Sequence, residues 1–255
     1  MKTARILWQG KTFTAQVDAD VLTLADGLQI AFDDLTSKGK WLPPVNPGTI
    51  FALGLNYADH AKELAFNQAP EKPLVFLKGR NALTGHASES VRPADVTFMH
   101  YECELAVVIG TGGKNIDEAQ ALEHVSGYTI ANDYAFRDYL ENYERPNLRV
   151  KNRDACTPLG PWLVSADEIA DPMKLALTTR VNGEITQQGT TADMIFSVPA
   201  LISYLSSVMT LSPGDVILTG TPHGVVDCKV GDVVSTEIEG LGKLVNTIVA
   251  PPEPG

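Results

Sequence analysis

The stretch of sequence that decides the fold covers residues 98–109 and reads Phe-Met-His-Tyr-Glu-Cys-Glu-Leu-Ala-Val-Val-Ile. Side chains alternate between the two faces of a strand, so Glu102 and Glu104 point the same way. The run that follows, Leu105–Ile109, has no polar face, which is typical of a strand buried on both sides. We therefore expect a central strand at Tyr101–Ile109 that carries two carboxylates into a partly buried region.

Two carboxylates on one buried face need a compensating charge. A bound cation offsets both their mutual repulsion and the cost of removing each from water. His100 lies on the same face, and Asp133, which closes an apolar strand expected at Gly127–Ala131, adds a third carboxylate. A solvated face for Glu102 and Glu104, and a turn at the Asn-Asp pair, explain the same residues without a metal. If a cation binds, all-oxygen ligands favour Mg²⁺ or Mn²⁺ over zinc or copper and leave positions open for a chelating substrate.

The rest of the chain has a β-rich pattern with few helices. Strands are expected at Arg5–Trp8, Thr12–Val17, Val21–Leu24, Leu28–Phe32, Thr49–Leu55, Leu74–Leu77, Leu175–Val181 and Glu184–Gln188, and after the turns at Pro213–Asp215 and Val230–Asp232. Helices are expected at Tyr57–Ala65, Ile116–His124 and Val198–Ser207. Because regular βαβ alternation is missing, we expect an α+β fold built on a mixed β-sandwich or β-roll, and neither a Rossmann sheet nor a (β/α)8 barrel.

Residues 38–48 divide the chain into two parts. This segment is rich in Lys, Gly and Pro, and it follows several short strands, so it reads as a connector. We expect a small N-terminal β-domain over residues 1–46 and a larger domain, which carries the chemistry, over residues 47–255.

Charge and composition exclude several classes of partner. The formal net charge is −11, which disfavours nucleic acid and anionic membranes. No stretch approaches the ~20 apolar residues of a transmembrane helix, and the first ten residues lack the apolar core of a signal peptide. The three cysteines are sparse and contain no CxxC pair, which fits a reducing compartment. We therefore expect a cytoplasmic protein without membrane or nucleic-acid partners.

Cations are concentrated at a few places in this acidic chain. Lys78 ends one expected strand, Arg137 lies four residues after Asp133, and the segment Arg145–Arg153 is strongly basic. These groups could bind the carboxylates of an anionic substrate. A solvated loop, or pairing with nearby acids, is an equally good explanation of the basic segment.

Two further patterns are weaker. His60 and Glu63 lie three apart on an expected helix, an arrangement that suits a general acid/base pair but is usually a surface salt bridge. The turn Thr219–Pro222 could offer N–H groups and the Thr221 hydroxyl to an oxyanion, although such turns are common. The run Gly110–Gly113 lacks the spacing of a phosphate-binding loop, which argues against a nucleotide.

Taken together, the motifs resemble the fumarylacetoacetate hydrolase family across roughly residues 47–250. The resemblance rests on these segments in this order: Gly54–His60, Phe76–Lys78, Tyr101–Leu105, Ala131–Tyr134, Gln188–Met194 and Leu218–Pro222. Two more segments, Arg137–Tyr143 and Arg145–Lys151, are similar to the branch that decarboxylates and isomerises intermediates of homoprotocatechuate (4-hydroxyphenylacetate) degradation, especially its C-terminal half.

The resemblance implies roles for individual residues. Glu102, Glu104 and Asp133 would bind Mg²⁺ or Mn²⁺, and the fold would be the family's mixed β-sandwich roll. The resemblance places Lys151 beside the metal, and Lys78, Arg137, Thr221 and Arg149 in the pocket of a small anionic 2-oxo acid. It places His60 and Glu63 on a lid-like segment, where they and Lys151 are candidate catalytic proton carriers.

The resemblance also implies an assembly. Family members form a dimer or a higher homo-oligomer, and the related branch carries two fused copies of a domain that occurs once here. We expect a homodimer or larger homo-oligomer, with a paralogous subunit as the other possibility.

Three hypotheses of function follow. The first is decarboxylation of 5-oxopent-3-ene-1,2,5-tricarboxylate with isomerisation of 2-hydroxyhepta-2,4-diene-1,7-dioate. The second is C–C hydrolysis of an acylpyruvate or fumarylpyruvate, which is disfavoured because Arg137-Asp138 is followed by Tyr-Leu-Glu where many family members have a nearby Gln. The third is a non-catalytic subunit of a hetero-oligomer, which is disfavoured because the acidic and basic residues are all present.

Overall fold

The structure is a computed structural model of the chain, and it describes residues 1–59, 71–140 and 147–252. The strands are β1 Lys2–Trp8, β2 Lys11–Asp18, β3 Val21–Thr23, β4 Gln29–Ala31, β5 Lys40–Leu42, β6 Ile50–Gly54, β7 Leu74–Lys78, β8 Leu83–Thr84, β9 Ser88–Val91, β10 Met99–His100, β11 Cys103–Ile109, β12 Val125–Asn132, β13 Ala135–Phe136, β14 Thr157–Ser165, β15 Ala176–Val181, β16 Glu184–Thr190, β17 Val216–Leu218, β18 Val233–Ile238 and β19 Gly242–Val249. The α-helices of the described residues are α1 Phe32–Lys38, α3 Leu148–Lys151 and α4 Val198–Val208. Short 3-10 helices are η1 Arg80–Ala82, η2 Glu118–His124, η3 Arg137–Tyr139, η4 Ala166–Glu168 and η5 Thr191–Asp193.

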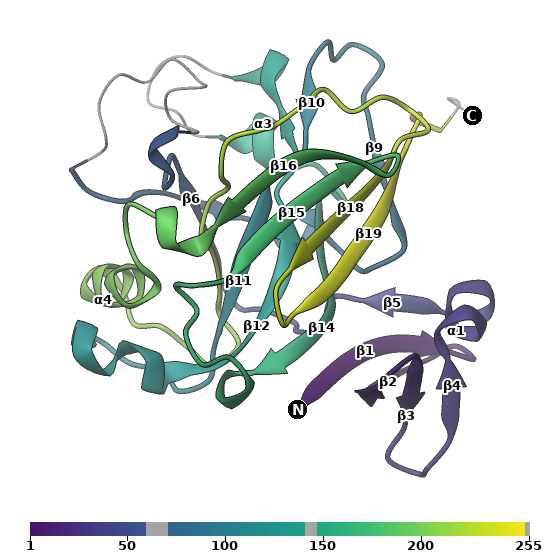
Figure 1. The fold of residues 1–255 in the computed structure, drawn as a ribbon, viewed down its shortest axis with the longest axis horizontal. Helices are drawn as coiled ribbons and strands as arrows, with labels where there is room; N and C mark the ends of the chain where they lie inside the picture. Colours follow the sequence, from purple (N-terminus) through teal and green to yellow (C-terminus); the bar gives the residue numbers. More distant parts are fainter. Residues whose placement is uncertain (60–70, 141–146, 253–255) are drawn as a thin grey trace.

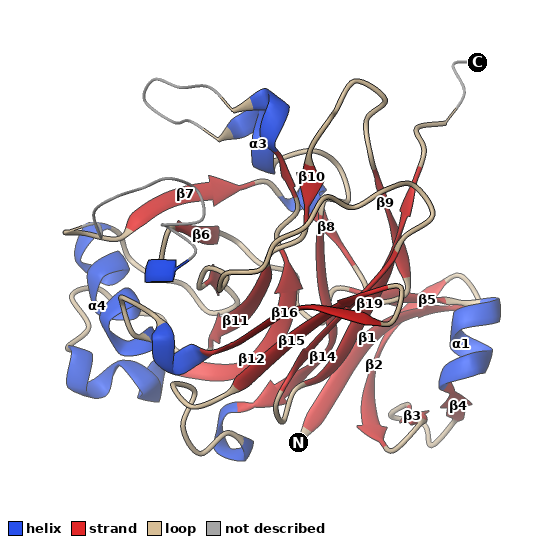
Figure 2. Ribbon diagram, turned by 45° about the horizontal axis from the view of Figure 1, so that its top comes forward, coloured by secondary structure: helices blue, strands red, loops and turns tan. Residues whose placement is uncertain are grey.

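Two β-sheets form the body of the molecule. The larger sheet has the order β4-β3-β2-β1-β14-β12-β11-β17-β6-β7, with β5 paired to β1 and β8 paired to β14. The smaller sheet has the order β16-β15-β18-β19-β9 and crosses in front of β11, β12 and β14, while α4 lies beside them (Figures 1 and 2). This β-rich, mixed arrangement confirms the predicted α+β class.

Strand β11 runs through the middle of the molecule. All seven of its residues are buried. Leu105 and Val107 belong to the core cluster shared with the smaller sheet and α4, while Ala106 and Val108 pack in a second cluster on the opposite face. The prediction of a strand buried on both sides is therefore confirmed.

The pairing of β11 with β12 places the polar residues of the predicted site together. The strands are antiparallel, and Cys103 lies opposite Asn132 while Glu104 lies opposite Ala131. The start of β11 thus meets the end of β12, and the Asp133 N–H donates to the Glu102 carbonyl oxygen at 2.9 Å. Residues thirty positions apart in the chain are adjacent because of this register.

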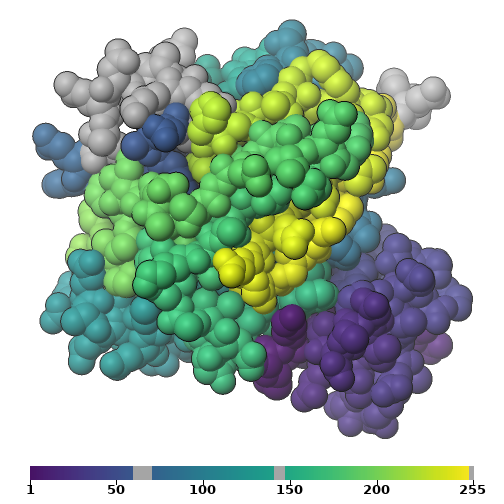
Figure 3. Space-filling model, in the orientation of Figure 1, coloured from purple at the N-terminus to yellow at the C-terminus, as the bar shows by residue number. Residues whose placement is uncertain are grey.

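The N-terminal strands form a lobe of their own (Figure 3). Ile6, Leu22, Leu35 and Trp41 are among the buried residues of its separate core. The lobe also continues the larger sheet, since β1 pairs with β14 through Lys2↔Val164 and Thr3↔Leu163. The boundary between residues 1–46 and 47–255 remains a prediction.

Several segments differ from the sequence-based expectation, and strands β9, β14 and β19 were not predicted. The strand expected to reach Phe32 ends at Ala31, and helix α1 follows, because Asp33 and Asp34 stabilise its positive N-terminal end and Leu35 is buried. The expected connector contains β5, which pairs with β1. The helix expected at Ile116–His124 is the 3-10 segment η2, whose only buried residue is Ala121, so packing favours no longer α-helix.

Candidate metal centre

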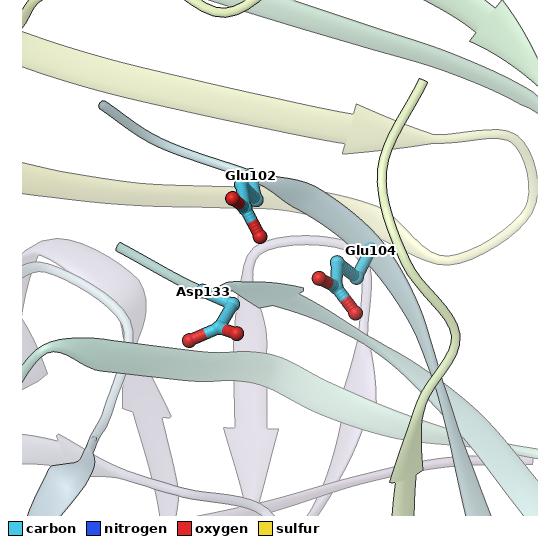
Figure 4. Close-up of side chains that lie close together, drawn as sticks. All are labelled: Glu102, Glu104 and Asp133. Carbon is cyan, nitrogen blue, oxygen red and sulfur yellow. The ribbon is translucent and has the colours of Figure 1, made fainter. Parts of the chain in front are cut away.

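Three buried carboxylates meet where β11 begins and β12 ends (Figure 4). Each of Glu102, Glu104 and Asp133 offers one oxygen, and these oxygens all lie within 4.8 Å of one another. The residues are 6%, 0% and 1% exposed, respectively. This is the geometry expected of a cation site, and the solvated-face alternative is wrong.

Glu104 is the carboxylate least compensated by the protein. Its Oε2 accepts the Gly220 N–H at 2.7 Å, but its buried Oε1 has no hydrogen-bond partner. Burial first, and then the charges of Asp133 and Glu102, raise the Glu104 pKa well above its usual range. An unpartnered buried oxygen among all-oxygen donors fits a hard divalent cation such as Mg²⁺ or Mn²⁺.

Two lysines face the carboxylates from the other side. Lys78 Nζ lies 2.7 Å from Asp133 Oδ1, and Lys151 Nζ lies 2.5 Å from Glu102 Oε2 and 3.0 Å from Asp133 Oδ2. Burial lowers the Lys151 pKa, but Asp133 and Glu102 outweigh this, so the pKa is raised and the ammonium stays charged. The two lysines pair with Glu102 and Asp133 but not with Glu104, and they place anion-binding groups beside the carboxylates.

Arg137 completes the basic edge of the site. Its Nε donates to His100 Nε2 at 2.7 Å, and another guanidinium nitrogen lies 3.4 Å from Glu102 Oε1. Burial, above all, lowers the pKa of His100 to about 3, so the ring is neutral. The position of His100 beside the glutamates confirms the strand-based expectation.

Thr221 follows Gly220, the residue whose N–H binds Glu104. It is 2% exposed, and its Oγ1 accepts a hydrogen bond from Gln187 Nε2 at 3.0 Å. Gln187 also donates to the Pro222 carbonyl and accepts from the Thr179 hydroxyl, so its amide orientation is fixed. Sequence reasoning missed Gln187, because nothing in its spacing distinguishes it from the exposed Gln188.

A buried polar network holds the end of β12 against the smaller sheet. Asn132 Nδ2 donates to the Thr236 hydroxyl at 2.8 Å, and Asn246 Nδ2 donates to the Tyr134 hydroxyl at 2.8 Å. These contacts flank Asp133 on both sides in sequence. Such a network restricts the backbone that positions a ligand.

Of the predicted site residues that the structure describes, Arg149 stands apart from these contacts. Arg149 is exposed, and its Cζ lies 4.8 Å from the centre of the Tyr139 ring. It precedes Lys151 by two residues on α3, so the two side chains point in different directions. His60 and Glu63 lie outside the described residues.

Comparison with known proteins gives the family. The model of the fumarylacetoacetate (FAA) hydrolase C-terminal family matches residues 49–249. The chain belongs to this family. It is 62% identical over 221 residues to the 4-hydroxyphenylacetate degradation bifunctional isomerase/decarboxylase of Salmonella dublin, a match that covers 86% of this chain and 51% of the relative. The chain thus spans about half the length of this curated relative.

Solved structures of family members have the same fold. The 5-carboxymethyl-2-hydroxymuconate delta-isomerase of Mycobacterium smegmatis is 36% identical, with a TM-score of 0.86 over 99% of this chain and 100% of the other. The fumarylpyruvate hydrolase of Pseudomonas aeruginosa, solved in complex with Mn²⁺ and pyruvate, is 34% identical, with a TM-score of 0.77 over 81% of this chain and 91% of the other. A divalent metal is therefore used within the family, and this chain has a carboxylate site for one.

Two other expectations concern the chain as a whole. Cys103, Cys156 and Cys228 are free and buried, and burial raises the pKa of each thiol. Within residues 1–59, 71–140 and 147–252, no helix has the length and apolar character needed to cross a membrane.

Proposed function

We propose that this chain decarboxylates 5-oxopent-3-ene-1,2,5-tricarboxylate and isomerises 2-hydroxyhepta-2,4-diene-1,7-dioate, with Mg²⁺ or Mn²⁺ as cofactor, in homoprotocatechuate catabolism. The observation that carries the proposal is the buried cluster of Glu102, Glu104 and Asp133 bordered by Lys78 and Lys151. The choice of substrate rests on the 62% identity to the bifunctional isomerase/decarboxylase.

In this proposal the carboxylates bind the metal ion and the neighbouring cations bind the substrate. Glu102, Glu104 and Asp133 would hold the ion, which as a Lewis acid would lower the cost of negative charge on the substrate's oxo oxygen. Lys151, 6% exposed at its side chain, would contact the oxo-acid group, and Lys78 would orient the Asp133 carboxylate. The Arg137 guanidinium and the Thr221 hydroxyl would bind further substrate oxygens. Arg149 would bind a substrate carboxylate at the solvent-exposed edge of the site.

The reaction consumes one proton for each CO₂ released. The bond to the departing carboxylate breaks, and its electron pair moves through the alkene to the oxo oxygen, giving a dienol product. Ketonisation then moves a proton from oxygen to carbon. We assign the proton carriers to His60 and Glu63, with Lys151 as the third candidate, since a positioned acid or base accelerates such steps by ~10²–10⁴-fold.

The cellular setting is part of the proposal. We infer a cytoplasmic homodimer or higher homo-oligomer, with a separately encoded paralogous subunit as the alternative. The support for a partner is that the curated relative is about twice as long as the matched region.

Product analysis tests the proposal. The Mg²⁺- or Mn²⁺-loaded protein is given a panel of 2-oxo-enoate di- and tricarboxylates, and CO₂ release is followed together with dienol absorbance. Decarboxylation predicts CO₂ from the tricarboxylate and loss of dienol absorbance from the diacid. Two carboxylic acid fragments would instead support C–C hydrolysis, the activity named for the Pseudomonas aeruginosa neighbour.

Metal dependence provides the control. Chelator treatment should abolish turnover, and added Mg²⁺ or Mn²⁺ should restore it. A Glu104→Gln variant that keeps full activity in chelator would rule out the proposed role of the carboxylates. A pure protein that binds metal but converts no compound of the panel would indicate a non-catalytic subunit.

A further inference from the structure

His100 and Arg137 form a fixed pair at the edge of the metal centre. The His100 side chain is fully buried, whereas the Arg137 side chain is 22% exposed. Arg137 makes two polar side-chain contacts with the described residues, one to His100 and a longer one to Glu102. One end of the pair is thus held inside the protein, and the other retains N–H groups for a ligand.

Hydrogen-bond chemistry assigns the proton on the His100 ring. A guanidinium only donates, so Nε2, which accepts from Arg137, is the unprotonated nitrogen. Nδ1 therefore carries the proton and donates to the Tyr101 carbonyl oxygen, 2.9 Å away. The neutral ring is held at both nitrogens.

The local backbone brings the two residues together. β10 and β13 are antiparallel, with Met99 opposite Phe136 and His100 opposite Ala135. The Arg137 N–H then donates to the Phe98 carbonyl oxygen at 3.0 Å. A two-stranded sheet therefore places the imidazole beside the first residue of η3.

We propose that His100 is a positioning residue that orients the Arg137 guanidinium toward a carboxylate of the bound 2-oxo acid. The inference rests on the proposed function, in which Arg137 binds substrate. An arginine side chain has many rotamers, and at 3.4 Å the Glu102 carboxylate competes for the guanidinium. The Nε hydrogen bond to His100 fixes the plane of the guanidinium and leaves its outer N–H groups for the ligand.

Ligand binding to four variants tests the proposal. Pyruvate and 2-oxoglutarate are titrated into Mn²⁺-loaded protein carrying His100→Leu, His100→Gln, Arg137→Leu or both leucine changes. His100→Leu should weaken binding of at least one probe by on the order of tenfold to a hundredfold, as misplaced binding groups do. His100→Gln should restore most of the affinity, because its Oε1 can accept from Arg137 Nε. The double variant should bind no more weakly than Arg137→Leu alone, since His100 acts through Arg137.

The outcomes separate this inference from the proposed function. If Arg137→Leu weakens ligand binding but His100→Leu does not, the positioning role of His100 is wrong. The same holds if the two losses of affinity multiply in the double variant. In either case the proposed function stands. If Arg137→Leu binds both probes normally, the assignment of Arg137 to the substrate is wrong, and the positioning role falls with it. His124→Leu, the same change at a histidine outside the metal centre, is the matched control and should leave binding unchanged.

A measurement without metal or substrate keeps the proposal testable if His100→Leu does not fold. The ring nitrogens of His100 in the metal-free protein are examined by ¹⁵N NMR. A hydrogen bond accepted by Nε2 from the Arg137 Nε–H, and slow solvent exchange of that Nε–H, are the expected results. The absence of this hydrogen bond, with fast exchange of the Arg137 Nε–H, would overturn the proposal.

Discussion

Glu104 is the carboxylate whose ionised form would gain most from a bound cation. It is fully buried, and one of its oxygens has no hydrogen-bond partner. We expect Glu104→Gln to weaken Mn²⁺ binding by more than the ~10–100-fold typical of changes outside the ligand shell. Titration calorimetry of the metal-free protein measures this, with the exposed Glu123→Gln as the charge-matched control. Equal Mn²⁺ affinity of the two variants would remove Glu104 from the ligand set.

Glu104→Gln, which should weaken metal binding, should raise the stability of the metal-free protein. Because the folded-state pKa of Glu104 is raised above its ordinary value of 4.5, the folded protein binds this proton more tightly than the unfolded chain. The wild-type protein therefore loses stability as the pH rises above about 4.5. The Glu104→Gln variant does not, because its side chain has no proton to lose. In chelator at pH 7.5 the Tm of Glu104→Gln should exceed that of the wild type, and the difference should vanish below pH 4.5. A lower Tm at both pH values would contradict this.

Gln187 orients Thr221, and both the nitrogen and the oxygen of its side-chain amide form hydrogen bonds. Replacing it with leucine leaves the Thr221 and Thr179 hydroxyls and the Pro222 carbonyl without this partner in the interior. We expect Gln187→Leu to lower the free energy of unfolding by about 1–3 kcal/mol and to raise KM. Urea unfolding and steady-state kinetics test this. Gln188→Leu, on the exposed neighbour, should change neither.

At the residue scale, prediction from sequence succeeds where side-chain direction follows from local geometry. Strand alternation predicted that Glu102 and Glu104 share one face, and their oxygens lie close together. His100 belongs to the separate strand β10, and its ring lies beside Glu102. Gln187 was missed because its importance comes from contacts with Thr179 and Thr221, and those contacts depend on how two sheets pack. No single-strand pattern contains that information.

At the scale of elements, turn chemistry was the most reliable signal. Asn182 and Gly183 both have positive φ, as a two-residue hairpin turn requires, and β15 and β16 pair as predicted. Helix α4 begins after Ser197, whose Oγ accepts from the Ala200 N–H, and it lies within one residue of its predicted bounds. Elements α1, β5, β14 and β19 are among those that were missed. The first two are a seven-residue helix and a three-residue strand that form by packing on the N-terminal core and have little periodicity of their own.

Element η3 carries Arg137, and one carboxylate fixes it in place. Asp138 accepts from the Thr97 N–H, the Thr97 hydroxyl and the Phe98 N–H, and these bonds lower the Asp138 pKa to about 2. We expect Asp138→Ala to remove the hydrogen bonds that hold η3 in place. The variant should bind 2-oxoglutarate more weakly, as Arg137→Leu should, while its Mn²⁺ affinity is unchanged. Parallel titrations of metal and 2-oxoglutarate measure both. Because the pKa is depressed, the Asp138 contribution to stability is full above its ordinary value of 3.8 and is lost as the pH falls toward 2.

At the scale of the whole molecule, pairings between distant segments set the architecture. β1 joins β14 across more than 150 residues, and β17 lies parallel to β6, so one sheet is assembled from remote parts of the chain. The fold class was predictable from the abundance of short strands, but the strand order was not. Strand order depends on which edges remain unpaired after the local hairpins form, and a single sequence does not specify this.

The N-terminal lobe supports the larger unit without contributing to the metal centre. The described ligands and basic residues of the site all lie beyond residue 46. The lobe packs Phe32 against Trp162, and its Met1 carbonyl oxygen accepts a hydrogen bond from the Ser165 N–H. We expect a chain of residues 47–255 to fold with unchanged Mn²⁺ affinity and with an unfolding free energy lower by about 2–3 kcal/mol, roughly the cost of exposing one large side chain. Titration calorimetry and urea unfolding test the two parts separately. Loss of metal binding in a folded fragment would mean that the lobe maintains the geometry of β12 through β14, and the boundary at residue 46 would then divide one cooperative unit.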